Sequence, residues 1–399
     1  MTGPSEIVRL AARGDGVTAD GRHMAFAAPG DRIADNGDIV PGPNRQTPPC
    51  RHFGHCGGCQ LQHIDDAAYA AFLTARIAGA LGQHGLSAEI QPAHLSPPAA
   101  RRRAAMRAIR AGKSLSLGFA EAGSHRLIDL RMCPILHPEL FAMVAPLRAL
   151  LGALLPDKGL ADVRLTLADQ GIDLLIEARL AEDYRTIEAL GDFAREHRLA
   201  RLALDRGGGS ELLWEPEPVT ITLGGVAVAL PPAAFLQATA DGEAALTGAV
   251  LEIVRRAGRA ADLFSGLGTF ALPLARAGAS VLAVEGARDP IAALTRAAAL
   301  AKLPVKGLHR DLFRRPMTAE ELAGLDAIVL DPPRAGASAQ VVEIGRVSVP
   351  VVAMVSCNPA TFARDARTLV DGGYRLGRLW PVGQFRWSTH VELVAELRR

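Results

Sequence analysis

The stretch DLFSGLGTFALPLA, residues 262–275, places a glycine-rich turn between a short apolar run and a helix-forming run. Such a turn lets backbone amides approach a bound ligand closely at the N-terminus of a helix. Glu285 ends the next apolar run, SVLAVEG, at the ~20-residue spacing expected of an acid that binds a ribose hydroxyl. An ordinary strand, turn and helix of an α/β fold is the plainer alternative.

Outward from this turn, residues 231–399 alternate short apolar runs with helical patterns. The apolar runs end in Gly, Asp, Pro or Cys, and they are ADLFSG, SVLAVEG, LDAIVLDPPR and VPVVAMVSC. Continuous apolar strands separated by helices indicate a doubly wound parallel sheet. Ligands of such sheets bind at the carboxyl ends of the strands, so we expect Glu285, Asp331 and Cys357 around one crevice.

The rest of the chain has two other patterns. Residues 1–48 are rich in Gly, Asp and Pro and contain short alternating runs, which predicts a small β module. Residues 49–230 mix strand-like runs with helical ones, including a helix expected over residues 66–84, and predict an α+β domain. A length of 399 residues fits such a division into two or three domains.

The five cysteines fall into two groups. Cys50, Cys56 and Cys59 form a C-x5-C-x2-C run, and Cys133 can complete a set of four thiolate ligands. Four thiolates suit zinc or an iron–sulfur centre, and the spacing does not separate the two. Cys357 is left as a candidate nucleophile before a helix, whose positive end favours the thiolate. A buried, inert cysteine is the alternative reading of that position.

Composition and charge limit the classes of protein to which the chain can belong. No apolar run approaches the roughly 18 residues of a membrane span, and the N-terminus lacks the pattern of a signal peptide. We therefore expect a soluble, cytoplasmic protein with no membrane partner, in which thiols stay reduced. The net charge of +2 does not favour or oppose a nucleic-acid partner. The basic stretch Arg101–Lys113 is equally typical of a solvated helix face and of a phosphate-binding surface.

Several stretches together resemble the S-adenosylmethionine-dependent RNA uracil-C5 methyltransferases, which make 5-methyluridine in rRNA or tRNA. They are CRHFGHCGGCQLQH, LGFAEAGSHRLIDLRMC, FLQAT, DLFSGLGTF, DPPRAG, SCNPATFARD and QFRWSTHVELVAEL. The resemblance covers nearly the whole chain and implies an α/β fold in three domains. These are a short, incomplete OB-like TRAM module (1–48), a central α+β domain with a cysteine cluster and an RNA-binding surface (49–230), and a Rossmann-like methyltransferase domain (231–399).

The resemblance also implies roles for single residues. It makes Cys357 the nucleophile and Glu392 the base. Position 5 of uracil becomes nucleophilic only after a thiolate adds to C6, and a base must then remove the C5 proton so that elimination frees the enzyme. Thr269 and Thr239 stand where the family more often has Asn, but each retains a hydroxyl donor and acceptor. The residues implied to bind S-adenosyl-L-methionine are Gln237, Phe264, Thr269, Glu285, Asp311 and Asp331.

For the four clustered cysteines, the resemblance favours a [4Fe-4S] cluster over zinc. Its expected role is structural or RNA-contacting, because methyl transfer moves no electrons. RNA is the expected partner, with 23S rRNA preferred over tRNA, and the protein is expected to act as a monomer. Only residues 34–49 separate Ile33 from Cys50, and this segment of turn-forming residues is too short to finish a TRAM barrel.

Three alternatives stand beside a 23S rRNA enzyme acting on an unpaired or flipped-out uridine. The first is a tRNA uracil-C5 methyltransferase. The second, an RNA cytosine-C5 methyltransferase, belongs to a family that normally has two cysteines in its catalytic region, whereas this chain has only Cys357 there. The third, a non-catalytic iron–sulfur RNA-binding protein, predicts loss of Cys357 or Glu392, and both are present.

Overall fold

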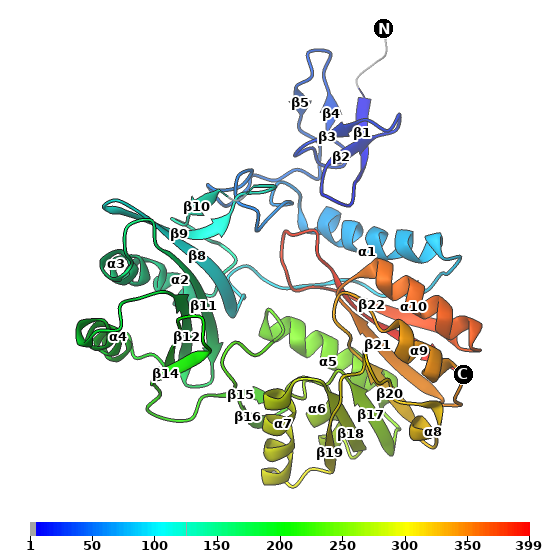
Figure 1. Ribbon diagram of the computed structural model, residues 1–399. Helices are drawn as coiled ribbons and strands as arrows, with labels where there is room; N and C mark the ends of the chain where they lie inside the picture. The colour runs from blue at the N-terminus through cyan, green and yellow to red at the C-terminus, as the bar shows by residue number, and fades with distance from the viewer. Residues whose placement is uncertain (1–4, 125) are drawn as a thin grey trace. The chain divides into compact units, whose positions relative to one another are not determined.

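The computed structural model describes residues 5–124 and 126–399, which form two compact units (Figure 1). The first unit comprises the chain up to Phe72 together with Pro97–Val219 and Phe385–Thr389. The second unit comprises Leu73–Ser96, Thr220–Gln384 and His390–Arg399. The chain therefore passes between the units several times. The three sequence ranges with boundaries near residues 48 and 230 remain a prediction of domain organisation.

A nine-stranded sheet forms the centre of the second unit. Its strand order is β19-β18-β17-β20-β21-β23-β22-β6, and β7 also pairs with β22. The strands from β19 to β21 are parallel, whereas β23 is antiparallel to both β21 and β22. The strands are β6 Glu89–Ile90, β7 His94–Leu95, β17 Arg259–Leu263, β18 Ser280–Glu285, β19 Val305–His309, β20 Ala327–Leu330, β21 Val351–Ser356, β22 Arg375–Gly383 and β23 Glu392–Arg398. The order reverses between β17 and β20, and such a reversal opens a crevice at the carboxyl ends of the strands.

Helices precede, connect and follow the parallel strands, as the alternation in the sequence predicted. They are α5 Ala240–Val254, α6 Ala271–Arg276, α7 Arg288–Leu300, α8 Ala319–Leu322, α9 Ser338–Gly345 and α10 Pro359–Asp371. Helix α5 packs against β21, β22 and β23, while α6 packs against β17 and β18. The side chain of Asn358 caps α10 by accepting a hydrogen bond from the backbone N–H of Ala360 at 3.1 Å, and Pro359 occupies the first turn. The doubly wound sheet is therefore confirmed. A small hairpin of β15 Thr220–Leu223 and β16 Val226–Ala229 precedes α5.

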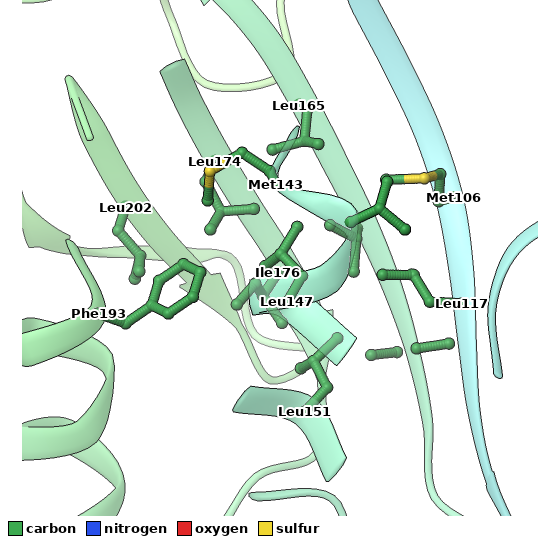
Figure 2. Close-up of a cluster of buried hydrophobic side chains, with 14 of the residues drawn as sticks. Met106, Leu117, Met143, Leu147, Leu151, Leu165, Leu174, Ile176, Phe193 and Leu202 are labelled. Carbon is green, nitrogen blue, oxygen red and sulfur yellow. The ribbon is translucent and has the colours of Figure 1, made fainter. Parts of the chain in front are cut away.

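The first unit contains a seven-stranded sheet with the order β10-β9-β8-β11-β12-β13-β14. The strands are β8 Arg103–Ala111, β9 Ser114–Ala120, β10 Leu127–Asp129, β11 Leu160–Ala168, β12 Gly171–Ala178, β13 Arg201–Asp205 and β14 Ser210–Trp214. Helices α2 Pro138–Ala142, α3 Val144–Leu154 and α4 Tyr184–Glu196 pack on it, and their apolar side chains join those of the strands in one core (Figure 2). Leu147 and Leu151 of α3 and Phe193 of α4 lie in this core. These elements confirm the expected mixture of helices and strands.

The basic stretch Arg101–Lys113 forms a β-strand in this sheet, so the interpretation as a helix face is wrong. Strand β8 pairs with β9 on one side and β11 on the other. Every second residue of β8 faces the core, and these buried residues are Ala104, Met106 and Ala108. Arg107, between two of them, is exposed and forms an ion pair with Asp162. The alternation of buried and exposed residues along β8 was not recognised in the sequence, because alanine contributes little to the apolar pattern that marks a strand.

The N-terminal β module is a five-stranded sheet with the order β3-β2-β1-β4-β5. The strands are β1 Ser5–Leu10, β2 Gly16–Thr18, β3 His23–Met24, β4 Arg32–Ile33 and β5 Ile39–Val40. Ile7, Ala27 and Ile33 form its small core. Strand β5 lies in the segment 34–49, which was expected to be too short to finish a TRAM barrel. Within the described residues β3 and β5 do not pair, and the sheet is not closed through them.

A long helix, α1 Asp66–Gln83, follows the first three clustered cysteines, within the range predicted from the sequence. Its N-terminal turn belongs to the first unit and its later turns to the second. In the part of the chain that the structure describes, α1 and the other helices lack the length and apolar character needed to cross a membrane.

Candidate active site

Cys357 and Glu392 come from neighbouring antiparallel strands of the second unit. Strand β21 ends at Ser356, which is paired with Leu393 of β23. The residue after Ser356 therefore lies opposite the residue before Leu393, and these two residues are Cys357 and Glu392. Glu392 is 7 % exposed, whereas Cys357 is half-buried. The insertion of β23 beside β21 thus brings together two residues that are well separated in the sequence.

The surroundings of Cys357 favour the protonated thiol. Burial raises the pKa of Cys357, and the charges of Glu392 and Asp331 raise it further. The guanidinium of Arg334 acts in the opposite direction without reversing the shift. The expectation that the start of α10 would favour the thiolate is therefore wrong for the ligand-free protein, because burial and two carboxylates outweigh the helix. At neutral pH the resting side chain is a thiol.

Two acids, the half-buried Asp331 and the completely buried Asp262, lie close to these residues. Asp331 follows β20, and burial together with the charges of Glu392 and Asp262 raises its pKa well above the ordinary value. Asp262, in β17, is completely buried, and neither of its carboxylate oxygens has a hydrogen-bond partner among the described residues. Burial raises the pKa of Asp262 to about 7, and the charge of Glu285 contributes to this rise. A buried carboxyl with two open acceptor atoms is suited to a cationic ligand.

Asp262 was not predicted as a site residue, although it begins the glycine-rich stretch. An acid inside an otherwise apolar parallel strand was the signal that could have identified it, since buried acids are rare without a partner. The sequence drew attention to the turn itself and to the acid that ends the next strand.

Glu285 holds the turn that follows β17. Its Oε2 accepts a hydrogen bond from the backbone N–H of Gly266 at 2.9 Å, and its Oε1 accepts one from Ala287 at 2.7 Å. Gly268 has a φ of 95°, and a Cβ at this position would lie 2.4 Å from Cδ1 of Leu294. Glycine is therefore required there by both conformation and space. Each oxygen of Glu285 keeps a further lone pair, so the carboxylate can still accept from a ligand hydroxyl.

An aromatic pair lies beside this turn. Phe264 has a φ of 66°, and its ring centre is 5.4 Å from that of Phe313, which is 52 % exposed and was not predicted from the sequence. Asp311 accepts a hydrogen bond from the backbone N–H of Phe313 at 2.9 Å. Its Cα would lie 3.5 Å from a Cβ on Gly286, so Asp311 is next to the end of β18. Thr269 is half-buried at the end of the turn. Flat rings beside acceptor carboxylates suit a nucleoside.

Gln237 is held by a glutamine that the sequence had not singled out. Nε2 of Gln384 donates to Oε1 of Gln237 at 2.7 Å, and Oε1 of Gln384 accepts from the backbone N–H of Ala238 at 2.7 Å. Gln384 lies just beyond Val382, which is paired with Glu392. The structure therefore places Gln237 at the same end of the sheet as the candidate base. Every site residue that the sequence predicted in the range 231–399 belongs to the second unit.

The four clustered cysteines lie together in the first unit. Cys50, Cys56, Cys59 and Cys133 line one cavity of about 530 Å³, and Arg101 lines it as well. Burial raises the pKa of Cys59 to about 12, and the charges of the other three cysteines add to this rise. Burial also raises the pKa values of Cys56 and Cys133. Among the described residues, no group of three or more His, Cys, Asp or Glu side chains is placed to hold a metal ion.

The fold and the site of the second unit define an α/β enzyme that binds a nucleoside-containing cofactor at the carboxyl edge of its sheet. The family described as tRNA (Uracil-5-)-methyltransferase matches residues 309–399. A protein of Zymomonas mobilis named an "uncharacterized RNA methyltransferase" is 50% identical over 390 residues, which are 98% of this chain and 98% of that protein. The 23S rRNA (uracil(1939)-C(5))-methyltransferase of Pectobacterium atrosepticum is 34% identical over 374 residues, which are 90% of this chain and 81% of the relative.

A solved structure shows the same fold. The tRNA (uracil-54, C5)-methyltransferase of Pyrococcus abyssi, solved in complex with S-adenosyl-L-homocysteine, superimposes with a TM-score of 0.77 over 99% of both chains, at 22% sequence identity. The chain belongs to the family of S-adenosylmethionine-dependent RNA uracil-C5 methyltransferases. The resemblance drawn from its sequence motifs is therefore confirmed.

Proposed function

We propose that this protein transfers the methyl group of S-adenosyl-L-methionine to C5 of a uridine in RNA through a covalent adduct of Cys357. The observation that carries the proposal is the strand register that sets Cys357 opposite Glu392. In the first step the Cys357 thiol loses its proton to solvent, and the thiolate sulfur forms a bond to C6. The electron pair released at C5 then takes the methyl group from the sulfonium, which leaves as the neutral thioether. Glu392 then accepts the C5 proton, the C5–C6 double bond re-forms, and the bond from sulfur to C6 breaks.

For the methyl donor we propose the carboxyl edge of β17, β18 and β20. Glu285 has free lone pairs for the ribose hydroxyls, and the rings of Phe264 and Phe313 offer an apolar surface for the base. Asp262 is suited to the positively charged part of the donor, because its oxygens are unpartnered within the described chain. The full set implied by the family pattern is Gln237, Phe264, Thr269, Glu285, Asp311 and Asp331, to which the geometry adds Asp262.

We propose 23S rRNA as the substrate. The relative named for 23S rRNA matches 90% of this chain at 34% identity, whereas the family described for tRNA matches only residues 309–399. A tRNA enzyme is the second candidate, supported by that family description. In either RNA the target uridine must leave its stack, because C5 and C6 are not accessible inside a helix.

Mapping of 5-methyluridine in rRNA and tRNA, from cells with and without this gene, tests the substrate and the reaction together. We expect one 5-methyluridine of 23S rRNA to disappear when the gene is deleted and to return with the intact gene. Loss from tRNA alone would show the second candidate to be right. Loss of a 5-methylcytidine, or of no modification, would contradict the uracil reaction.

We further propose that Cys50, Cys56, Cys59 and Cys133 hold a [4Fe-4S] cluster. Burial, and next to it the charges of neighbouring cysteines, raise the pKa values of Cys56, Cys59 and Cys133, and a metal centre would replace the protons and remove the repulsion between the thiolates. All four cysteines line one cavity of about 530 Å³, which leaves space among them for a four-iron centre. The cluster takes no part in the methyl transfer.

Protein purified without oxygen is expected to be brown and to contain about four iron atoms per chain, since each iron of the cluster takes one cysteine ligand. Cys59→Ser should lose the colour and most of the iron. Cys357→Ala is the matched control, because it removes the one cysteine outside this group and should leave the iron content unchanged. Zinc in equal amount to the protein, with no iron, would contradict the cluster.

A further inference from the structure

The segment Phe385–Thr389 belongs to the first unit, although β22 before it and β23 after it are strands of the second. The carbonyl oxygen of Trp387 accepts two hydrogen bonds, from the backbone N–H groups of Gln60 and Leu61, both at 2.9 Å. Gln60 directly follows Cys59, one of the four clustered cysteines. The segment that leads to Glu392 is therefore bonded to the backbone next to a cysteine of the cluster.

A buried tyrosine holds the same segment at two more points. The hydroxyl of Tyr69 lies 3.1 Å from the carbonyl oxygen of Phe385 and 3.1 Å from that of Ser388. Its single hydrogen is shared between these two acceptors. Tyr69 is completely buried, and its bond to the carbonyl of Ser388 is buried as well, so water does not readily replace the hydroxyl there. An ion pair between Arg386 and Asp66 adds a contact on the surface.

Arg101 connects the segment with the cysteine cavity. Its guanidinium lies 5.2 Å from the centre of the Phe385 ring, and the same side chain lines the cavity of the four cysteines. A cation over an aromatic face at this distance is attractive, and more so away from water. A group bound in the cavity would therefore be connected to the segment in two ways. One is the side chain of Arg101, and the other is the backbone that follows Cys59.

The conformation of Trp387 shows that the segment depends on these contacts. Trp387 has a φ of 58°, in the left-handed region that a bulky residue rarely adopts, and its side chain is buried. Such a conformation is strained and persists only where the surroundings enforce it. If the contacts to Gln60, Leu61 and Tyr69 weaken, the segment is expected to relax.

We propose that Tyr69 and the backbone at Gln60 and Leu61 position Glu392 by fixing the segment Phe385–Thr389. This inference rests on the proposed function. Only His390 and Val391 separate the segment from Glu392, so its conformation determines where β23 begins. Cys357 follows β21, which is not part of the segment. Loosening of the segment therefore slows removal of the C5 proton more than formation of the bond between Cys357 and C6.

Tyr69→Phe is the variant that tests this inference, because it removes one hydroxyl and no cysteine. Its iron content should equal that of the unaltered protein, and it should bind covalently to RNA containing 5-fluorouridine at the normal rate. With ordinary RNA, turnover should fall about tenfold or more, since a buried hydrogen bond is lost. The methylated covalent adduct should then accumulate on denaturing gels. Amide hydrogen exchange in a peptide covering residues 385–392 should become faster.

Tyr374→Phe is the matched control. Tyr374 is also buried, and its hydroxyl donates to the carbonyl oxygen of Val349 at 2.9 Å, so it loses an equivalent bond. This control should release its product at the normal rate. Unchanged exchange at residues 385–392 in Tyr69→Phe, normal release, or an equal slowing of both steps would overturn the inference. Absence of any 5-fluorouridine adduct in the unaltered protein would instead reject the proposed function, and the exchange measurement would still decide whether Tyr69 fixes the segment.

Discussion

Cys357→Ala is expected to abolish methylation, with turnover lowered by about 10⁴-fold or more, as is usual when a covalent nucleophile is removed. Without the sulfur no bond forms at C6, and C5 stays too weak a nucleophile to attack the methyl donor. The variant should remain folded, because Cys357 is half-buried and alanine leaves only a small gap.

RNA containing 5-fluorouridine gives the direct measurement. Fluorine cannot leave C5 as a proton does, so the adduct between Cys357 and C6 should persist and shift the protein on a denaturing gel. Cys357→Ala should give no such band. A band of normal intensity in the variant would show that another residue is the nucleophile.

Glu285→Gln changes a proposed donor-binding residue at the same edge of the sheet and is compared here with Cys357→Ala. The amide oxygen can replace one acceptor of the carboxylate that holds Gly266 and Ala287, but the charge is lost. This variant should need more S-adenosyl-L-methionine and should recover its activity when the donor is saturating. Cys357→Ala should show no recovery at any donor concentration. Recovery of both variants would place Cys357 in donor binding and not in the covalent step.

The sequence predicted those strands whose apolar residues form an uninterrupted run. Strands β18, β20 and β21 are of this kind, and β17 is broken only by Asp262. A chemically distinctive residue stands at or directly after the end of β18, β20 and β21, namely Glu285, Asp331 and Cys357. Strand β19, VKGLH, was not recognised, because it lies at the edge of the sheet and its residues are only partly buried. Strand β8 was taken for a possible helix because alanines occupy two of its three buried core positions, on either side of Met106.

The sequence predicted those parts of the site that depend on a single motif, and not the contacts between distant parts of the chain. Cys357 and the acids at the strand ends could be placed at one edge, since parallel strands share their polarity. That Glu392 lies opposite Cys357 follows from the insertion of β23 between β21 and β22, a pairing between distant parts of the chain. Likewise, the bonds from Gln60, Leu61 and Tyr69 to the segment before Glu392 join residues that no local pattern connects.

Glu392→Gln is expected to lower turnover by about 10²–10⁴-fold, the usual contribution of a general base, and to leave the covalent adduct in place. Glutamine preserves the shape of the side chain but cannot accept the C5 proton, so elimination stops after methyl transfer. The adduct should therefore accumulate with ordinary RNA, where the unaltered protein releases its product. Normal release from Glu392→Gln would remove Glu392 as the base.

The same substitution should affect the first step in the opposite direction. The charge of Glu392 raises the pKa of the Cys357 thiol, so its removal lowers that pKa and increases the thiolate fraction at neutral pH. Adduct formation with 5-fluorouridine RNA should then be faster in Glu392→Gln than in the unaltered protein, and the difference should shrink as the pH rises above the pKa of the unaltered thiol.

Glu396→Gln is the matched control on the same strand. Glu396 is buried like Glu392 and lies on the same face of β23, but its carboxylate is paired with Arg378 and Arg398. Its replacement should lower thermal stability, because Arg398 loses its carboxylate partner and Arg378 keeps only Glu252, and should leave the rates of the two chemical steps unchanged. If adduct formation becomes faster and product release slower in Glu392→Gln but not in Glu396→Gln, the cause is the position of the Glu392 carboxylate beside Cys357. A weakened strand would affect both variants.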